Sequence, residues 1–166
     1  MQKQIWGSVA LFGLVLLVSE VSLNADDKKD EKDKNEVAFP ELPKGAGKID
    51  KDPPQAFTET ESGLKYRVLR KGEGKPPKST ATVEVNYQGW LDDGKVFDSS
   101  YKRKEPISFP LNRVIKGWTE GMQLVGEGGM IELEIPADLG YGDRGAPPDI
   151  PPKANLHFLV ELIDVK

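Results

Sequence analysis

The chain has 166 residues, with no cysteine, one histidine (His157) and a formal net charge of −4. Without cysteine it can form no disulfide, thiol nucleophile or thiolate zinc site, and one histidine excludes a site built from several histidines. A weakly acidic chain has no general attraction to phosphate, so we expect no nucleic-acid partner. Any catalysis must depend on shape and hydrogen bonds more than on acid, base or metal groups.

Residues 1–25 have the pattern of a secretory signal peptide. Lys3 supplies the positive start, a mostly apolar run follows from Ile5 to Val18, and cleavage is expected after Ala25. A membrane span needs about 20 apolar residues, and Glu20 interrupts the run. We therefore expect export to the periplasm or secretion, with no membrane span in the mature protein. The alternative is an uncleaved N-terminal anchor that tethers the chain.

Residues 26–56 are predicted to be a disordered linker. Charges of both signs dominate its first part, and Pro40, Pro43, Pro53 and Pro54 follow. Such a composition buries too little apolar surface to offset the conformational entropy of the chain. One compact domain is expected after it, over residues 57–166.

Alternation of apolar and polar residues predicts antiparallel strands that each have one buried face. The two glutamates Glu132 and Glu134 fall on the predicted outer face, so we interpret them as solvated. His157 is out of phase with the apolar positions and is interpreted as a surface residue. The predicted strands are Leu64–Leu69, Thr80–Leu91, Val96–Phe97, Ile131–Ile135 and Leu156–Leu162, with a turn at Asp92–Lys95.

One segment, Val114–Leu124, is predicted to be a helix. Trp118 and Met122 lie four residues apart in it, whereas Gly117 and Gly121 lower its intrinsic propensity, so packing must hold it. A short helix against an antiparallel sheet predicts an α+β fold. The long Gly- and Pro-rich loop over 137–153 is typical of functional or disordered loops.

Short motifs in the domain resemble those of FKBP-type peptidyl-prolyl cis-trans isomerases. In chain order they are Tyr87-Gln88-Gly89, Gly94-Lys95-Val96-Phe97-Asp98-Ser99-Ser100, Val114-Ile115-Lys116-Gly117-Trp118, Tyr141-Gly142, Ile150-Pro151-Pro152, Ala154-Asn155-Leu156 and Phe158. The resemblance covers residues 57–166. It implies a curled antiparallel β-sheet wrapped around one short α-helix, and an enzyme that accelerates X-Pro isomerisation during folding of exported proteins. It implies no cofactor and no metal.

The resemblance also implies a proline-binding pocket between sheet and helix, overhung by the loop from Gly140 to Ile150. Trp118 would form the floor, and the Tyr141 hydroxyl and the Ile115 N–H would donate hydrogen bonds to ligand carbonyls. Asp98 would accept a hydrogen bond or face the carbonyl carbon of the twisting imide. The expected catalytic residues are Tyr87, Phe97, Asp98, Ile115, Trp118, Tyr141 and Phe158, and the expected substrate-binding residues are Val114, Ile107, Phe109 and Ile150.

Unfolded or proline-containing polypeptides are the expected substrates, with macrolide inhibitors as a further class of ligand. Ile107 stands where the family often has an aromatic residue, Ala146 replaces a frequent histidine, and Asp149 occupies a usually apolar position. These departures predict weaker macrolide binding more than loss of isomerase activity. A binding module or chaperone that uses the same pocket without turnover is the alternative function. A hydrolase is disfavoured, because neither a serine–histidine pair nor a metal cluster is visible.

Overall fold

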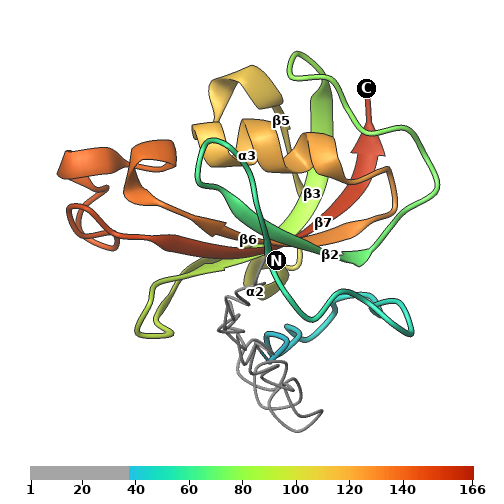
Figure 1. Ribbon diagram of the computed structural model, residues 1–166, viewed down its shortest axis with the longest axis horizontal. Coiled ribbons are helices and arrows are strands. Elements are labelled where there is room, and N and C mark those ends of the chain that lie inside the picture. The colour runs from blue at the N-terminus through green and yellow to red at the C-terminus, as the bar shows by residue number, and fades with distance from the viewer. Residues whose placement is uncertain (1–37) are drawn as a thin grey trace, which may run out of the picture. The chain divides into compact units, whose positions relative to one another are not determined.

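A seven-stranded antiparallel sheet dominates the structure, a computed structural model that describes residues 38–166 (Figure 1). The predicted signal peptide and the linker residues 26–37 lie outside the described residues. The strand order is β1-β2-β6-β7-β3-β4, and β5 also pairs with β3. The strands are β1 Thr58–Glu59, β2 Lys65–Arg70, β3 Thr82–Trp90, β4 Val96–Ser99, β5 Ile107–Pro110, β6 Met130–Ile135 and β7 Leu156–Val165.

Two helices lie on opposite sides of this sheet (Figure 1). Helix α2 is a single turn, Ser100–Arg103, and α3 spans Lys116–Gly121 before a 3-10 turn over Met122–Leu124. Further 3-10 turns form at Leu111–Arg113, Ala137–Leu139 and Gly142–Arg144. None of the helices among residues 38–166 combines the length and the apolar character that a membrane crossing requires. The predicted α+β class, a curled antiparallel sheet with one short helix against it, is confirmed, whereas β1, α2 and β5 were not predicted.

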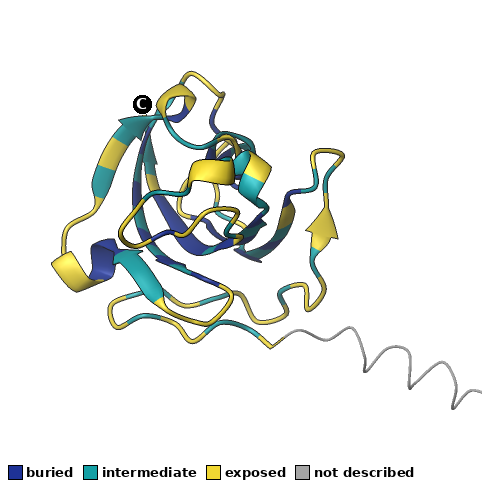
Figure 2. Cartoon of the chain, turned by 90° about the vertical axis from the view of Figure 1, so that its left-hand side faces the viewer, coloured by how far each residue is buried: buried dark blue, intermediate teal, exposed yellow. Residues whose placement is uncertain are grey.

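The inner face of the sheet and α3 form the main hydrophobic core. Along β3, Val83, Val85 and Tyr87 are buried, as their alternation predicts. Figure 2 shows the buried positions concentrated along the curved strands. A Cβ atom at Gly117 would lie 2.5 Å from Cγ2 of Ile135, so this glycine lets α3 approach β6 closely. Close packing therefore explains why a helix of low intrinsic propensity forms here.

The outer face of the sheet is also buried over part of its area, and here the predicted one-sided pattern is wrong. Glu132 is 5% exposed and forms an ion pair with Arg67, with Nε and Oε2 2.6 Å apart. Burial raises the pKa of Glu132, although Arg67 opposes this shift. Glu134 and His157 are partly buried rather than fully solvated, and His157 stacks on Trp90.

The cover of the outer face comes from residues 38–56, which we call the N-terminal arm. Phe39 and Ile49 of the arm pack against a small buried cluster formed by Leu69, Met130 and Leu159. The structure thus differs from the predicted linker over residues 38–56. Composition indicated disorder, but the arm packs apolar side chains against the apolar part of the sheet's second face.

Arg67 is the main polar attachment of the arm. It is 1% exposed and donates to the backbone oxygens of Gln55, at 2.8 Å, and Ala38, at 2.7 Å. Its guanidinium also lies 4.6 Å from the ring centroids of Phe39 and Phe57. A buried charge is tolerated only when it is paired and hydrogen-bonded. The arm therefore supplies hydrogen-bond acceptors for Arg67 that the sheet itself does not provide.

Removing the arm is expected to destabilise the domain. A chain that starts at residue 57 loses two hydrogen bonds to a buried guanidinium, so its free energy of unfolding should fall by at least about 3 kcal/mol relative to a chain that starts at residue 38. Urea unfolding followed by tryptophan fluorescence measures the difference. Equal unfolding midpoints for the two chains would show that the arm contributes nothing.

Candidate active site

A cavity of about 480 Å³ opens between the inner face of the sheet and α3. Every predicted site residue except Ile150 lines it, and Arg113 joins them. Ile150 lies in the hydrophobic core, 5% exposed, with its backbone paired to Ala146. The lining residues are Tyr87, Phe97, Asp98, Ile107, Phe109, Arg113, Val114, Ile115, Trp118, Tyr141 and Phe158.

Trp118 is held among three other aromatic rings of the cavity. Its ring packs edge-to-face on Tyr87 and on Phe158, with centroids 5.2 Å apart in both pairs, and tilted against Phe109 at 5.4 Å. Edge-to-face pairs are the favoured geometry for aromatic rings. The indole is 5% exposed, so its position is fixed by packing before any ligand arrives.

Gly89 on β3 makes room for the aromatic wall. A Cβ atom there would lie 2.6 Å from Cε1 of Phe158 and 2.6 Å from Cζ of Phe97. These two rings pack edge-to-face with centroids 5.5 Å apart. The motif Tyr87-Gln88-Gly89 therefore supplies both a wall residue and the gap that the other two rings fill.

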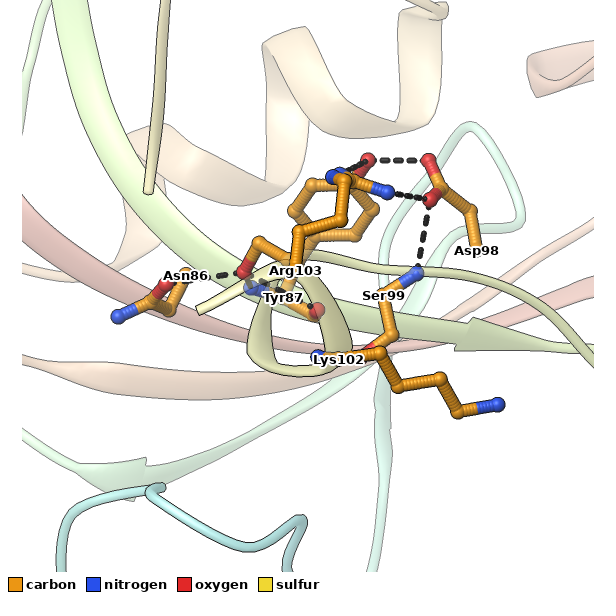
Figure 3. A network of polar contacts seen from close by, with 7 residues as sticks. Asn86, Tyr87, Asp98, Ser99, Lys102 and Arg103 are labelled. Carbon is orange, nitrogen blue, oxygen red and sulfur yellow. Dashed lines mark hydrogen bonds and ion pairs between the residues drawn. The ribbon is translucent and has the colours of Figure 1, made fainter. Parts of the chain in front are cut away.

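The polar side of the cavity is a closed network of three side chains (Figure 3). The Tyr87 hydroxyl donates to Oδ2 of Asp98, and Nη1 of Arg103 donates to Oδ1. Nη2 of Arg103 donates to the Tyr87 hydroxyl at 3.0 Å, and the backbone N–H of Ser99 donates to Oδ1 at 2.8 Å. Both carboxylate oxygens of Asp98 are thus engaged within the protein.

This network shifts the pKa values of its members. Burial and the hydrogen bond to Asp98 raise the pKa of Tyr87 to about 12, so its hydroxyl stays protonated as a donor. Partial burial alone would raise the pKa of Asp98, but the hydrogen bonds from Tyr87 and Arg103 outweigh it and hold that pKa below its usual value. Asp98 therefore remains a carboxylate at neutral pH.

Two hydrogen-bond donors at the edge of the cavity, and the buried indole N–H of Trp118 at its floor, have no acceptor among residues 38–166. The Tyr141 side chain is 43% exposed and lines the cavity, and its hydroxyl bonds to no described residue. The N–H of Ile115, the residue that precedes α3, likewise makes no hydrogen bond within the described part of the chain. The cavity can therefore hold an apolar ring on Trp118 and bind carbonyl oxygens at its edge.

Sequence reasoning missed two charged residues of this site. Arg103 lies on α2, a four-residue turn too short to give a periodic signal. Arg113 precedes Val114 in a motif that was interpreted only for its apolar residues, and it is exposed at the cavity. Arg103 follows Asp98 by five residues, but this spacing indicates an ion pair only if the chain between them is known to form a helical turn.

Comparison with known proteins gives concordant matches. The sequence profile of FKBP-type peptidyl-prolyl cis-trans isomerases matches residues 73–163. A Haemophilus influenzae protein described as a probable FKBP-type peptidyl-prolyl cis-trans isomerase is 54% identical over 106 residues, which are 64% of this chain and 44% of that protein. This chain thus spans less than half the length of that relative.

Solved structures match over the same share of the chain. The crystal structure of FkpA from Escherichia coli has a TM-score of 0.65 at 52% identity and covers 66% of this chain and 51% of its own. A peptidyl-prolyl cis-trans isomerase from Pseudomonas syringae has a TM-score of 0.62 at 40% identity and covers 66% of this chain and 80% of its own.

The pKa of Tyr87 should depend on Asp98. In the Asp98→Asn variant the carboxylate that raises this pKa is gone, so Tyr87 should titrate at lower pH than in the parent chain, where its pKa is about 12. Ring-carbon NMR shifts of Tyr87, followed from pH 8 upward, measure both titrations. Tyrosine ionisation at the same pH in the two proteins would contradict the network described above.

Substitution of Gly89 should damage the aromatic wall. Gly89→Ala places a methyl group where the Phe97 and Phe158 rings lie, and such overpacking costs about 1–3 kcal/mol of stability. Thermal unfolding measures that cost, and aromatic NMR signals of Phe97 and Phe158 should shift. Gly94→Ala is the matched control for added volume, because a Cβ there meets nothing within 4 Å, although its positive φ of 80° adds some backbone strain. A smaller loss at Gly89 than at Gly94 would refute the steric argument.

Proposed function

Because the chain belongs to the family of FKBP-type peptidyl-prolyl cis-trans isomerases, we propose that it catalyses cis–trans isomerisation of X-Pro bonds in polypeptides. The observation that carries the proposal is the aromatic cavity over Trp118 with two unengaged donors at its edge. The proposed substrates are unfolded or flexible chains that expose proline.

The reaction requires rotation about one amide bond and breaks no covalent bond. Resonance makes this rotation slow, with a barrier of about 20 kcal/mol. Resonance also places negative charge on the carbonyl oxygen, and that charge decreases as the amide twists toward 90°. An apolar cavity therefore favours the twisted amide over the planar one, because the planar form loses more solvation on entering it.

Moderate interaction energies are sufficient for useful catalysis. Removing an amide from water without full compensation costs about 1–3 kcal/mol in proteins. A hydrogen bond that fits only the twisted form adds about 1 kcal/mol. Each 1.4 kcal/mol, approximately, changes a rate tenfold, so these two contributions together accelerate the rotation by about one to three orders of magnitude.

Each residue of the cavity has a proposed role. The proline ring rests on Trp118, and the Ile115 N–H and the Tyr141 hydroxyl bind carbonyl oxygens next to it. Asp98 acts electrostatically, facing the carbonyl carbon, because Tyr87, Arg103 and Ser99 already occupy its carboxylate oxygens. The remaining wall and substrate-binding residues are Tyr87, Phe97, Phe158, Ile107, Phe109 and Val114.

The proposed setting is outside the cytoplasm, where the enzyme assists folding of exported proteins. The charge and apolar pattern of residues 1–25 supports export to the periplasm or secretion. Macrolide inhibitors are a further proposed class of ligand for the same cavity. Ile107, an aliphatic wall residue, offers them less aromatic surface, whereas Asp149 is exposed and is not part of the cavity lining.

Isomerase activity and its dependence on the aromatic floor can be tested together. NMR exchange spectroscopy of a proline peptide with the full chain should show catalysed cis–trans exchange. Trp118→Ala and Phe97→Ala should each lower kcat/KM at least about tenfold, because they remove the apolar surface, whereas Tyr141→Phe removes one hydrogen bond and should cost less than about fivefold.

Trp90→Ala is the matched control for loss of an indole, because Trp90 stacks on His157 away from the cavity. It should retain the parent rate. If the peptide's cis–trans exchange rate with the protein is no higher than without it, the proposed enzyme activity is rejected. If Tyr141→Phe lowers kcat/KM as much as Trp118→Ala and Phe97→Ala do, the proposal that the apolar floor dominates catalysis is rejected.

A further inference from the structure

The one-turn helix α2 places Arg103, the residue that completes the polar network of the cavity. An isolated turn of four residues is not stable in water, because helix nucleation is unfavourable. The Arg103 side chain is 45% exposed, so little packing holds it. The position of its guanidinium therefore depends on how α2 is attached to the rest of the fold.

One attachment of α2 is local and belongs to β3. The Ser100 hydroxyl accepts a hydrogen bond from the backbone N–H of Tyr87 at 2.8 Å and donates to Oδ1 of Asn86 at 2.9 Å. Ser100 is fully buried, and Figure 3 shows its partners Asn86 and Tyr87 beside Asp98 and Arg103. This contact fixes the first residue of the turn, and the Ser99 hydroxyl caps the turn by accepting from the backbone N–H of Lys102 at 3.4 Å.

The second attachment is the side chain of Tyr101, which is 9% exposed. Its hydroxyl donates to Oε2 of Glu161 on β7 at 2.6 Å. Burial and the hydrogen bond to this carboxylate raise the pKa of Tyr101, which keeps the hydroxyl protonated. The bond joins α2 to a residue 60 positions away in sequence, on the outer face of the sheet.

Glu161 is itself held rigidly. Its Oε1 accepts from Nη2 of Arg70 at 2.7 Å and from the backbone N–H of Gly47 in the N-terminal arm at 3.0 Å. Arg70 also donates to the backbone oxygens of Lys48 and Gly128, both at 2.7 Å. Both oxygens of the Glu161 carboxylate therefore have hydrogen-bond donors. Arg70 and Gly47 donate to Oε1, and Tyr101 of α2 donates to Oε2.

We propose that Tyr101 is a positioning residue for the isomerase site: its bond to Glu161 fixes the tilt of α2, and so keeps Arg103 on Asp98 and Tyr87. The arm and β2 thereby contribute to the site without touching the cavity, since they hold Glu161. This inference rests on the proposed function only for its catalytic consequence. The structural consequence, the occupancy of the Arg103–Asp98 ion pair, is independent of that function.

Tyr101→Phe removes the hydroxyl and keeps the buried ring. We expect kcat/KM for a proline peptide to fall about two- to tenfold, because the contact of Arg103 with Asp98 is weakened but not removed. Arg103→Ala should lower it at least as much, because it removes the group that Tyr101 positions.

A double-mutant cycle on the full chain separates positioning from general destabilisation. In the Arg103→Ala background, adding Tyr101→Phe should change kcat/KM by less than about 1.5-fold, since the residue through which it acts is absent. The same fold loss in both backgrounds would overturn the proposal. Tyr66→Phe is the matched control, because the Tyr66 hydroxyl bonds to no residue within 38–166, and it should leave the rate unchanged.

A second measurement does not need activity. The side-chain 15N–1H signals of Arg103 should be resolved in the parent chain, where the guanidinium is bound, and averaged by exchange in Tyr101→Phe. Unchanged Arg103 signals would overturn the proposal. If the parent chain shows bound Arg103 signals but no isomerase activity, only the proposed function is rejected. The effect of Tyr101→Phe on the Arg103 signals then still decides whether Tyr101 positions Arg103.

Discussion

The packing of Trp118 against Tyr87 and Phe158 is the constraint on which the site depends. The three rings come from α3, β3 and β7, so one set of edge-to-face contacts fixes the helix on the sheet and forms the cavity floor. Gly117 allows the close approach of α3, and Gly89 leaves space for the neighbouring wall. The fold and the cavity floor therefore depend on the same contacts.

The outer face of the sheet follows a different principle. Its buried side chains include the charged residues Arg67, Glu132 and Glu161, which are stable there only because each has partners. The N-terminal arm supplies several of those partners through backbone groups, including Ala38 and Gly47. Through Tyr101 and α2, this polar face is connected to the Asp98 side of the cavity on the other face.

Much of the cavity was predictable because its residues lie in compact motifs on elements with clear periodicity. Tyr87, Phe97 and Trp118 were assigned through the resemblance of their motifs to the FKBP family, and periodicity placed Tyr87 on the inner face of a strand and Trp118 on a helix. Arg103 could not, because α2 is one turn long and its orientation depends on Glu161, far along the chain. Ile150 was assigned to the site from its motif, but its side chain turns into the core.

The sequence by itself determined the family, the α+β class, the inward face of β3, β6 and β7 and the aromatic composition of the cavity, since these depend on local periodicity and motif order. Only the tertiary structure decided that the outer face is buried, that residues 38–56 belong with the domain, and that Glu132 is an ion-pair partner instead of a solvated residue. The physical reason is that a charged or proline-rich segment has the same local sequence pattern whether it is solvated or packs against the rest of the domain. Burial of a second sheet face is decided by which distant segment supplies partners for its charges.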